Sequence, residues 1–283
     1  MSKVPDGVDA HELTVAARRV LLDALTALNP QLNALTVVGG QAVYLRTPDA
    51  AVRSAAFTSD GDLSIDPLLL GEQPLLDEAL RAAGFTLRQQ SQPGLWEREE
   101  RIGDKTVPVE LDLLVPKDLS PAIGKRSAKV PPHGKMAARW IEGLEVAAVD
   151  RSPMQIASLE PHDGRCITVN VAGPVALLVA KAFKIRDRLA KADQRPDRLT
   201  DKDAGDVLRI MMVAPARQVA ESAATLRKDP RVGAVASEGL SLLHELFGAP
   251  ATPGVTMAVE ALRGDIPEQR IRALAPAFTA RLR

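Results

Sequence analysis

Two aspartates separated by one glycine lie in the segment Thr58-Ser59-Asp60-Gly61-Asp62-Leu63. Side chains at positions i and i+2 of a strand point to the same face, so Asp60 and Asp62 would lie side by side. Adjacent carboxylates repel each other unless a cation lies between them. A hard divalent cation such as Mg²⁺ prefers oxygen ligands and also binds phosphate oxygens. The pair therefore predicts a Mg²⁺ site suited to phosphoryl chemistry.

Two other interpretations of this pair remain open at the sequence level. Asp-Gly is a favoured turn, so the two carboxylates can simply mark a solvated loop. A calcium loop beginning at Asp60 fits poorly, because its sixth position is Ile65 rather than Gly and its twelfth is Gly71 rather than Glu.

A second acidic pair lies on a longer predicted strand, Thr106–Val115. Apolar and other residues alternate there with a period of two, which places Glu110 and Asp112 on one face. A two-metal site for nucleotidyl transfer needs two or three carboxylates from neighbouring strands. We favour Asp112 over Glu110 as the third ligand beside Asp60 and Asp62, and a solvated strand face is the alternative.

Glycines and lysines supply the candidates for binding phosphate. The strand predicted over Ala34–Val38 ends in Gly39-Gly40, where backbone amides can approach a phosphate closely, although a simple turn explains the pair as well. The segment Pro174–Arg188 begins with two turns that are apolar all round and should be buried. Lys181 is its first charge, which snorkels outward, meets a triphosphate or balances the aspartates.

The segment that follows this helix adds two more acids. Thr200 and Asp203 have the spacing of a capping box, which competes with a catalytic role for Asp203. Asp206 falls about one turn later on the same side of the predicted helix.

The composition places limits on the class of protein. Of the 283 residues, 36 are Lys or Arg and 36 are Asp or Glu, so net charge does not indicate a nucleic-acid partner. The single cysteine, Cys166, excludes an intramolecular disulfide and is expected to be a small buried residue. No run approaches about 18 apolar residues, and the N-terminus lacks the apolar segment of a secretion signal. We therefore expect a cytoplasmic protein with no membrane partner.

The order of predicted elements indicates an α+β protein with two domains, 1–171 and 172–283. The first domain should hold a mixed sheet with helices, and the second should be helical. Strands are predicted at 34–38, 63–65, 85–89, 94–99 and 106–115, a loop at 47–56, and mixed structure at 117–170. Helices are predicted at 10–28, 41–45, 75–83, 174–192, 201–213, 216–227, 232–247, 254–263 and 267–281.

Five segments in this order resemble the AbiEii-like, type IV toxin nucleotidyltransferases, a group that includes the mycobacterial MenT toxins. The segments are VVGGQAV at 37–43, TSDGDL at 58–63, VELDLL at 109–114, LLVAKAFKIRDR at 177–188 and KDAGDVL at 202–208. The resemblance covers about 37–208 and implies a polymerase-β-like nucleotidyltransferase fold followed by a helical domain.

The resemblance also implies roles for individual residues. Asp60 and Asp62 would hold Mg²⁺ with Asp112, Lys181 would contact the nucleotide, and Asp203 would be a late catalytic acid. The nucleotide-binding set would be Gly39, Gly40, Thr58, Ser59, Lys181 and Lys184.

The activity implied is transfer of a nucleoside monophosphate from a nucleoside triphosphate to an acceptor hydroxyl, with release of pyrophosphate. In the family the known acceptor is the tRNA 3′ end, and a cognate antitoxin protein neutralises the toxin. Alternatives are a small-molecule or protein acceptor, or a non-catalytic nucleotide-binding module. A basic groove would follow RNA phosphates, unless these residues form only a solvated face: Lys125, Arg126, Lys129, Lys135, Lys184 and Arg188.

Overall fold

The computed structural model of the chain describes residues 4–48, 50 and 58–283, and most of the loop predicted at 47–56 lies outside them. Contacts divide the chain into two units. The sheet unit comprises Met1–Ala42, Phe57–Ile141 and Arg151–Ala172, and the helical unit comprises Val43–Ala56, Glu142–Asp150 and Gly173–Arg283. The chain passes for the last time from the sheet unit to the helical unit between Ala172 and Gly173, next to the boundary predicted at 171/172. The assignment of two earlier segments to the helical unit was not predicted from the sequence.

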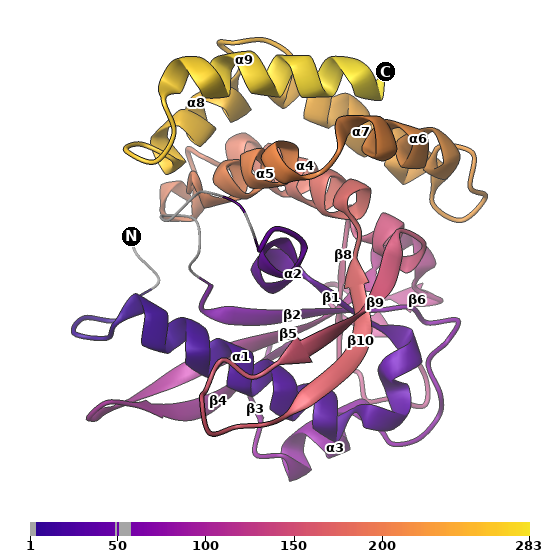
Figure 1. Cartoon of the computed structure of the whole chain (residues 1–283). Coiled ribbons are helices and arrows are strands. Elements are labelled where there is room, and N and C mark those ends of the chain that lie inside the picture. The colour runs from indigo at the N-terminus through magenta and orange to yellow at the C-terminus, as the bar shows by residue number, and fades with distance from the viewer. Residues whose placement is uncertain (1–3, 49, 51–57) are drawn as a thin grey trace. The chain divides into compact units, whose positions relative to one another are not determined.

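A mixed sheet organises the sheet unit and confirms the predicted α+β class (Figure 1). Its strand order is β3-β4-β5-β2-β1-β10-β9, and β8 also pairs with β5. The pairs β1–β10, β2–β5 and β5–β8 are parallel, and the other pairs are antiparallel. The strands are β1 (Leu35–Val38), β2 (Asp60–Ile65), β3 (Thr86–Leu87), β4 (Leu95–Ile102), β5 (Lys105–Pro116), β8 (Arg139–Ile141), β9 (Arg151–Ala157) and β10 (Cys166–Ala172). A separate hairpin is formed by β6 (Ala122–Ile123) and β7 (Ala128–Lys129).

The alternation in β5 sets which side chains enter the core. Val107, Val109 and Leu111 are buried, whereas Glu110 and Asp112 are half-buried on the other face. β1 is buried at every position, as expected of a short apolar strand in the middle of a sheet.

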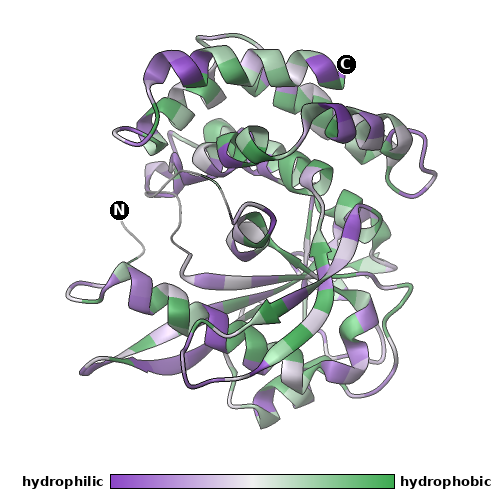
Figure 2. Cartoon of the chain, viewed as in Figure 1, coloured by the Kyte–Doolittle hydropathy of each residue, from purple (hydrophilic) through white to green (hydrophobic). Residues whose placement is uncertain are grey.

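Helix α1 (Ala10–Ala27) shows how a local signal begins an element. The carboxylate of Asp9 accepts hydrogen bonds from the backbone N–H groups of His11 and Glu12, at 2.9 and 3.0 Å, and so caps the helix. The apolar face of α1 packs on β2, β4 and β5. Its mixture of hydrophilic and hydrophobic residues is visible in Figure 2. The other helices of the first half are α2 (Gly39–Arg46) and α3 (Leu76–Ala82).

The helical unit follows the predicted order of helices closely. They are α4 (Pro174–Ala190), α5 (Lys202–Val213), α6 (Ala216–Leu226), α7 (Gly233–Phe247), α8 (Pro253–Ala261) and α9 (Glu268–Thr279). Short 3₁₀ turns lie at Asn29–Ala34, Lys117–Leu119, Glu145–Ala148, Pro196–Arg198 and Ala280–Leu282. α4 packs on α5 and α7. Among the described helices, none has the length and apolarity that a membrane crossing requires.

Asp150 explains why Glu142–Asp150 belongs with the helices. α4 begins with Pro174 in its first turn and has no side-chain cap from its own N-cap residue, Gly173. The carboxylate of Asp150 instead accepts a hydrogen bond of 2.8 Å from the N–H of Ala176. Burial raises the pKa of Asp150, against the opposing effect of that bond and of the Arg46 charge.

Two expectations for residues 117–170 need correction. β9 and β10 form an antiparallel pair there, and β10 lies beside β1 in the sheet, yet the sequence predicted only mixed structure. Cys166, expected to be buried, is exposed at the start of β10. The first residues of β10 alternate with exposed neighbours, and the pattern becomes buried only near Val169 and Val171.

Gly94 provides a test of the sheet geometry. Its φ is +71°, and an added Cβ would lie 2.5 Å from the Arg139 nitrogen and 2.6 Å from the Leu113 oxygen. We expect Gly94→Ala to lower the free energy of unfolding by about 2–4 kcal/mol, from left-handed strain plus a backbone clash. Gly103 has φ of +60° but no atom within 4 Å of an added Cβ, so Gly103→Ala should cost only about 1 kcal/mol. Denaturant unfolding would measure both, and equal losses would contradict this account.

Candidate functional site

The pairing of β2 with β5 brings the two predicted acidic pairs together. In this parallel register Asp60 lies opposite Glu110, and Asp62 lies opposite Asp112. Residues opposite each other on neighbouring strands share a face, so four carboxylates form one acidic cluster on the sheet. All four side chains are half-buried. The turn interpretation of Asp60-Gly61-Asp62 is wrong, because all three residues lie within β2.

Thr58 and Gly39 fix the positions of the two aspartates. The buried Thr58 hydroxyl donates a hydrogen bond of 2.9 Å to Oδ1 of Asp60. Gly39 has φ of +66°, and a Cβ added there would lie 1.8 Å from Oδ2 of Asp62. Only glycine leaves room for that carboxylate. Gly39 and Gly40 begin helix α2 rather than a loop, and their predicted role in phosphate binding stays a prediction.

The electrostatics separate Asp112 from Glu110. Oε1 of Glu110 lies 2.8 Å from Nη1 of Arg88, so this acid has its own cation. Burial, and then the charge of Asp62, raise the pKa of Asp112 to about 8, although Arg139 acts in the opposite direction. Of these two acids, Asp112 therefore gains more from an additional cation, and its choice as the third metal ligand stays a prediction.

The donor set suits Mg²⁺ in its chemistry, since it consists of carboxylate oxygens from adjacent strands. Within the described ranges, no three His, Cys, Asp or Glu side chains are gathered so that they could hold a metal ion. Mg²⁺ is usually bound by one or two carboxylates, with waters and substrate phosphates completing its shell. Two aspartates would meet that requirement, and the three-ligand set stays a prediction.

A cavity of about 220 Å³ borders the acidic cluster on the Glu110 side. Ser59, predicted to bind nucleotide, lines it together with Glu110, Pro5, Leu13 and Pro108. The cavity thus leaves space beside this edge of the cluster among the described residues.

A second charged cluster lies in the helical unit, between α4 and α5. Nζ of Lys181 lies 2.6 Å from Oδ1 of Asp203 and 2.6 Å from Oδ2 of Asp206. All three residues are buried. Burial favours a lower pKa for Lys181, but the two carboxylates outweigh it and raise the pKa. Burial likewise favours a higher pKa for Asp203, and its cations hold that pKa well below the ordinary value.

Three sequence interpretations change with this second cluster. Lys181 does not snorkel outward, because it is only 5% exposed. The capping box is wrong: no side chain caps α5, and the Thr200 hydroxyl accepts a bond of 3.0 Å from Arg188. Lys184 and Arg188, predicted to line a basic groove, lie 3.2 and 2.6 Å from Asp203.

Asp206 is the member of this cluster to which the sequence assigned no role. Its Oδ2 meets Lys181, whereas its Oδ1 is buried and has no hydrogen-bond partner. Its position one turn after Asp203 was the available signal. No comparable signal marked Arg88 or Arg139, which act on the acidic cluster from β3–β4 and β8.

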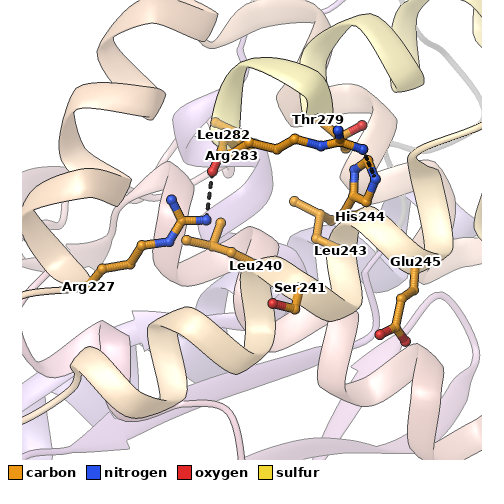
Figure 3. Close-up of a pocket in the computed structure, with 9 residues that line it drawn as sticks. All are labelled: Arg227, Leu240, Ser241, Leu243, His244, Glu245, Thr279, Leu282 and Arg283. Atoms are coloured by element: carbon orange, nitrogen blue, oxygen red, sulfur yellow. Dashed lines mark hydrogen bonds between the residues drawn. The ribbon is translucent and has the colours of Figure 1, made fainter.

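A larger cavity, of about 360 Å³, lies in the helical unit (Figure 3). Arg227 donates a hydrogen bond of 2.6 Å to the Leu282 carbonyl at its edge, and Arg283 contacts Nε2 of His244. Its lining residues are Arg227, Leu240, Ser241, Leu243, His244, Glu245, Thr279, Leu282 and Arg283. None of the predicted site residues lines this cavity.

Comparison of the chain with protein-family models, with curated proteins and with solved structures finds no match.

The raised pKa of Asp112 predicts a pH dependence of stability. The folded protein keeps the Asp112 proton at pH values where the unfolded chain has released it. The free energy of unfolding of the metal-free protein should therefore fall as pH rises from about 4 to about 8. Asp112→Asn should remove this part of the slope. Denaturant unfolding in EDTA at several pH values would measure it, and an unchanged slope in the variant would refute the assignment.

The buried cluster predicts unequal roles for two lysines of α4. Lys181→Met leaves Asp203 and Asp206 buried without their shared cation, which should cost about 3–5 kcal/mol of stability. Lys184 contacts the same Asp203 with a side chain 47% exposed, so Lys184→Met should cost about 0–1 kcal/mol. Thermal and denaturant unfolding of the two variants would show this difference. Similar losses would mean that Lys181 is not the central cation.

Proposed function

We propose that the chain is a Mg²⁺-dependent nucleotidyltransferase of the polymerase-β-like class. The observation that carries the proposal is the register of β2 and β5, which places Asp60 and Asp62 beside Glu110 and Asp112. Such a concentration of carboxylates on one sheet face is suited to divalent cations and, through them, to a triphosphate.

The resemblance to AbiEii-like toxins adds support, because its segments fall on consistent elements. VVGGQAV covers the end of β1 and the start of α2, TSDGDL leads into β2, and VELDLL lies in β5. LLVAKAFKIRDR lies in α4, and KDAGDVL begins α5. The two lysine-bearing segments are therefore on successive helices, as in the family pattern, and the last of them also carries Asp203 and Asp206.

In the proposed reaction Asp60 and Asp62 would hold Mg²⁺, which would neutralise charge on the triphosphate. Thr58 keeps the carboxylate of Asp60 in place, and Gly39 gives Asp62 its room. An acceptor oxygen forms a bond to the α-phosphorus while the bond to the β-phosphate oxygen breaks, and pyrophosphate leaves. Asp112, in its carboxylate form, takes the proton of the acceptor hydroxyl.

By the same resemblance the acceptor is the 3′ end of tRNA, and the protein is a cytoplasmic toxin with a cognate antitoxin. Nothing in the acidic cluster itself selects RNA over a small molecule or a protein hydroxyl. The acceptor therefore rests on the resemblance, and its test is separate from the test of the chemistry.

A second candidate is a nucleotide-binding module without catalysis. The observation that favours it is the buried cluster of α4 and α5, where Lys181 and Asp203 bind each other instead of facing solvent. If these residues only stabilise the fold, the nucleotide loses a contact that the family resemblance implies.

Substitution of the aspartates separates these candidates. We expect Asp60→Asn and Asp62→Asn each to lower nucleotidyl transfer by about 10³-fold or more, since each removes a ligand from the cation that stabilises the transferring phosphate. Glu110→Gln is the matched control and should stay within about tenfold, because Arg88 already holds Glu110. EDTA should abolish transfer by the unaltered protein.

The assay is incorporation of α-³²P-labelled nucleotide, with each of the four nucleoside triphosphates in turn, into total tRNA, aminoglycosides or protein. Mass spectrometry of tRNA after expression would name the nucleotide and the acceptor together. Nucleotide binding without transfer to any acceptor would favour the second candidate.

A further inference from the structure

The hairpin of β6 and β7 is the most strongly basic part of the sheet unit. Residues 117–140 contain six Lys or Arg and a single acid, Asp118, in a chain of zero net charge. The turn of the hairpin carries Lys125 and Arg126, and Lys129 lies at its end. With Lys135 these four side chains are all exposed. We call them the hairpin cations.

Like several other exposed basic residues of the described chain, the hairpin cations have no carboxylate beside them, but here four of them fall within the 11 residues from Lys125 to Lys135. Across the described ranges, none of the four takes part in an ion pair. Lys184, by contrast, lies 3.2 Å from Asp203, and Arg88 lies 2.8 Å from Glu110. Four like charges held close together without acids create a positive field that an anionic partner would relieve.

The backbone holds the hairpin cations in an ordered arrangement. The hairpin closes with a hydrogen bond of 2.8 Å from the Gly124 N–H to the Ser127 carbonyl. The indole N–H of Trp140 donates to the Gly124 carbonyl at 3.0 Å, and its backbone N–H donates to the Arg126 carbonyl at 3.3 Å. Lys117 stacks on the Trp140 ring, 5.5 Å from its centre. This half-exposed aromatic therefore lies beside the cations.

The same strand connects the hairpin to the acidic cluster. Trp140 belongs to β8, which pairs with β5 so that Arg139 lies opposite Leu114. Leu114 is two residues beyond Asp112 on β5, a distance of about 7 Å along a strand. The basic hairpin, a separate two-stranded sheet, is therefore bridged from Ser127 to Arg139 of a strand that pairs with the strand carrying Glu110 and Asp112.

We infer that the β6–β7 hairpin is a docking surface for the phosphodiester backbone of a nucleic acid, with Trp140 available to stack on a base. The role of this surface in holding the acceptor strand rests on the proposed nucleotidyl transfer. Its role in binding nucleic acid does not depend on that proposal. The regular spacing of phosphates matches a row of lysines and arginines better than an isolated anion does.

The test uses the full chain, EDTA and no nucleotide, with fluorescently labelled 20-mers of RNA and of DNA with the same sequence. Four phosphate contacts predict that wild-type affinity falls about 50- to 150-fold between 50 and 200 mM salt. Replacing the hairpin cations (Lys125→Gln, Arg126→Gln, Lys129→Gln and Lys135→Gln) should remove most of this dependence. It should also weaken binding at least about 10-fold at 50 mM salt.

The matched control removes the same charge from the helical unit, through Arg198→Gln, Lys228→Gln, Arg270→Gln and Arg281→Gln, and should bind as the wild type does. A charge-preserving variant (Lys125→Arg, Lys129→Arg and Lys135→Arg) should also keep wild-type binding, which excludes misfolding as the cause. Tighter binding of the RNA or of the DNA 20-mer would support the proposed surface and would show which nucleic acid it binds.

Three results would overturn the inference: wild-type binding by the hairpin variant, an equal loss in the control variant, or polyglutamate competing as well as RNA. Asp60→Asn keeps the hairpin and should bind as the wild type does. If transfer fails while binding through the hairpin persists, the enzyme proposal is wrong and the surface stands. If transfer to RNA proceeds equally well without the hairpin cations, the surface is wrong and the enzyme proposal stands.

Discussion

Mutual repulsion among four carboxylates on two neighbouring parallel strands is the constraint on which the sheet unit depends. The register of β2 with β5 brings them together, and a shift by one residue would turn Asp60 and Asp62 toward the core. The chain accommodates the repulsion in several ways: Arg88 pairs with Glu110, Thr58 bonds to Asp60, and the pKa of Asp112 is raised. A fold that only needed stability would place apolar or neutral side chains at these positions.

The helical unit handles buried charge in the opposite way. Lys181 meets two carboxylates at 2.6 Å, and Lys184 and Arg188 add further cations to Asp203. The acids there are matched by cations from the same unit, and the pKa of Asp203 is depressed rather than raised. An acid with a depressed pKa is a poor proton acceptor, which makes Asp112 the better candidate for a general base and Asp203 the better candidate for a positioning residue.

The sequence predicted elements well where one periodic pattern governs them, as in β5 and in the helices from α4 to α9. It favoured Asp112 over Glu110 as a metal ligand, which stays a prediction, and it could not show that the distant Arg88 pairs with Glu110. Contacts between segments far apart in the chain could not be predicted from the sequence. Gly39 was interpreted through phosphate, whereas the structure places the Asp62 carboxylate against it. β9 and β10 escaped prediction because alternation gives only a weak signal where exposed residues such as Cys166 begin the strand.

Although the net charge of the chain is zero, acids gather on the faces of β2 and β5 and cations gather in the β6–β7 hairpin. This uneven distribution affects how an anionic acceptor can approach. The phosphates of a nucleic acid approaching Asp60, Asp62 and Asp112 would be repelled, since screening acts over about 8–10 Å at moderate salt. A site of this kind therefore needs positive charge beyond the metal, placed close enough to act within that distance. The hairpin cations are attached through β8 to the strand that carries Asp112. Under the proposed function the hairpin cations, which have no carboxylate beside them in the described ranges, would offset that repulsion, because cations neutralised by the protein's own acids would leave it uncompensated.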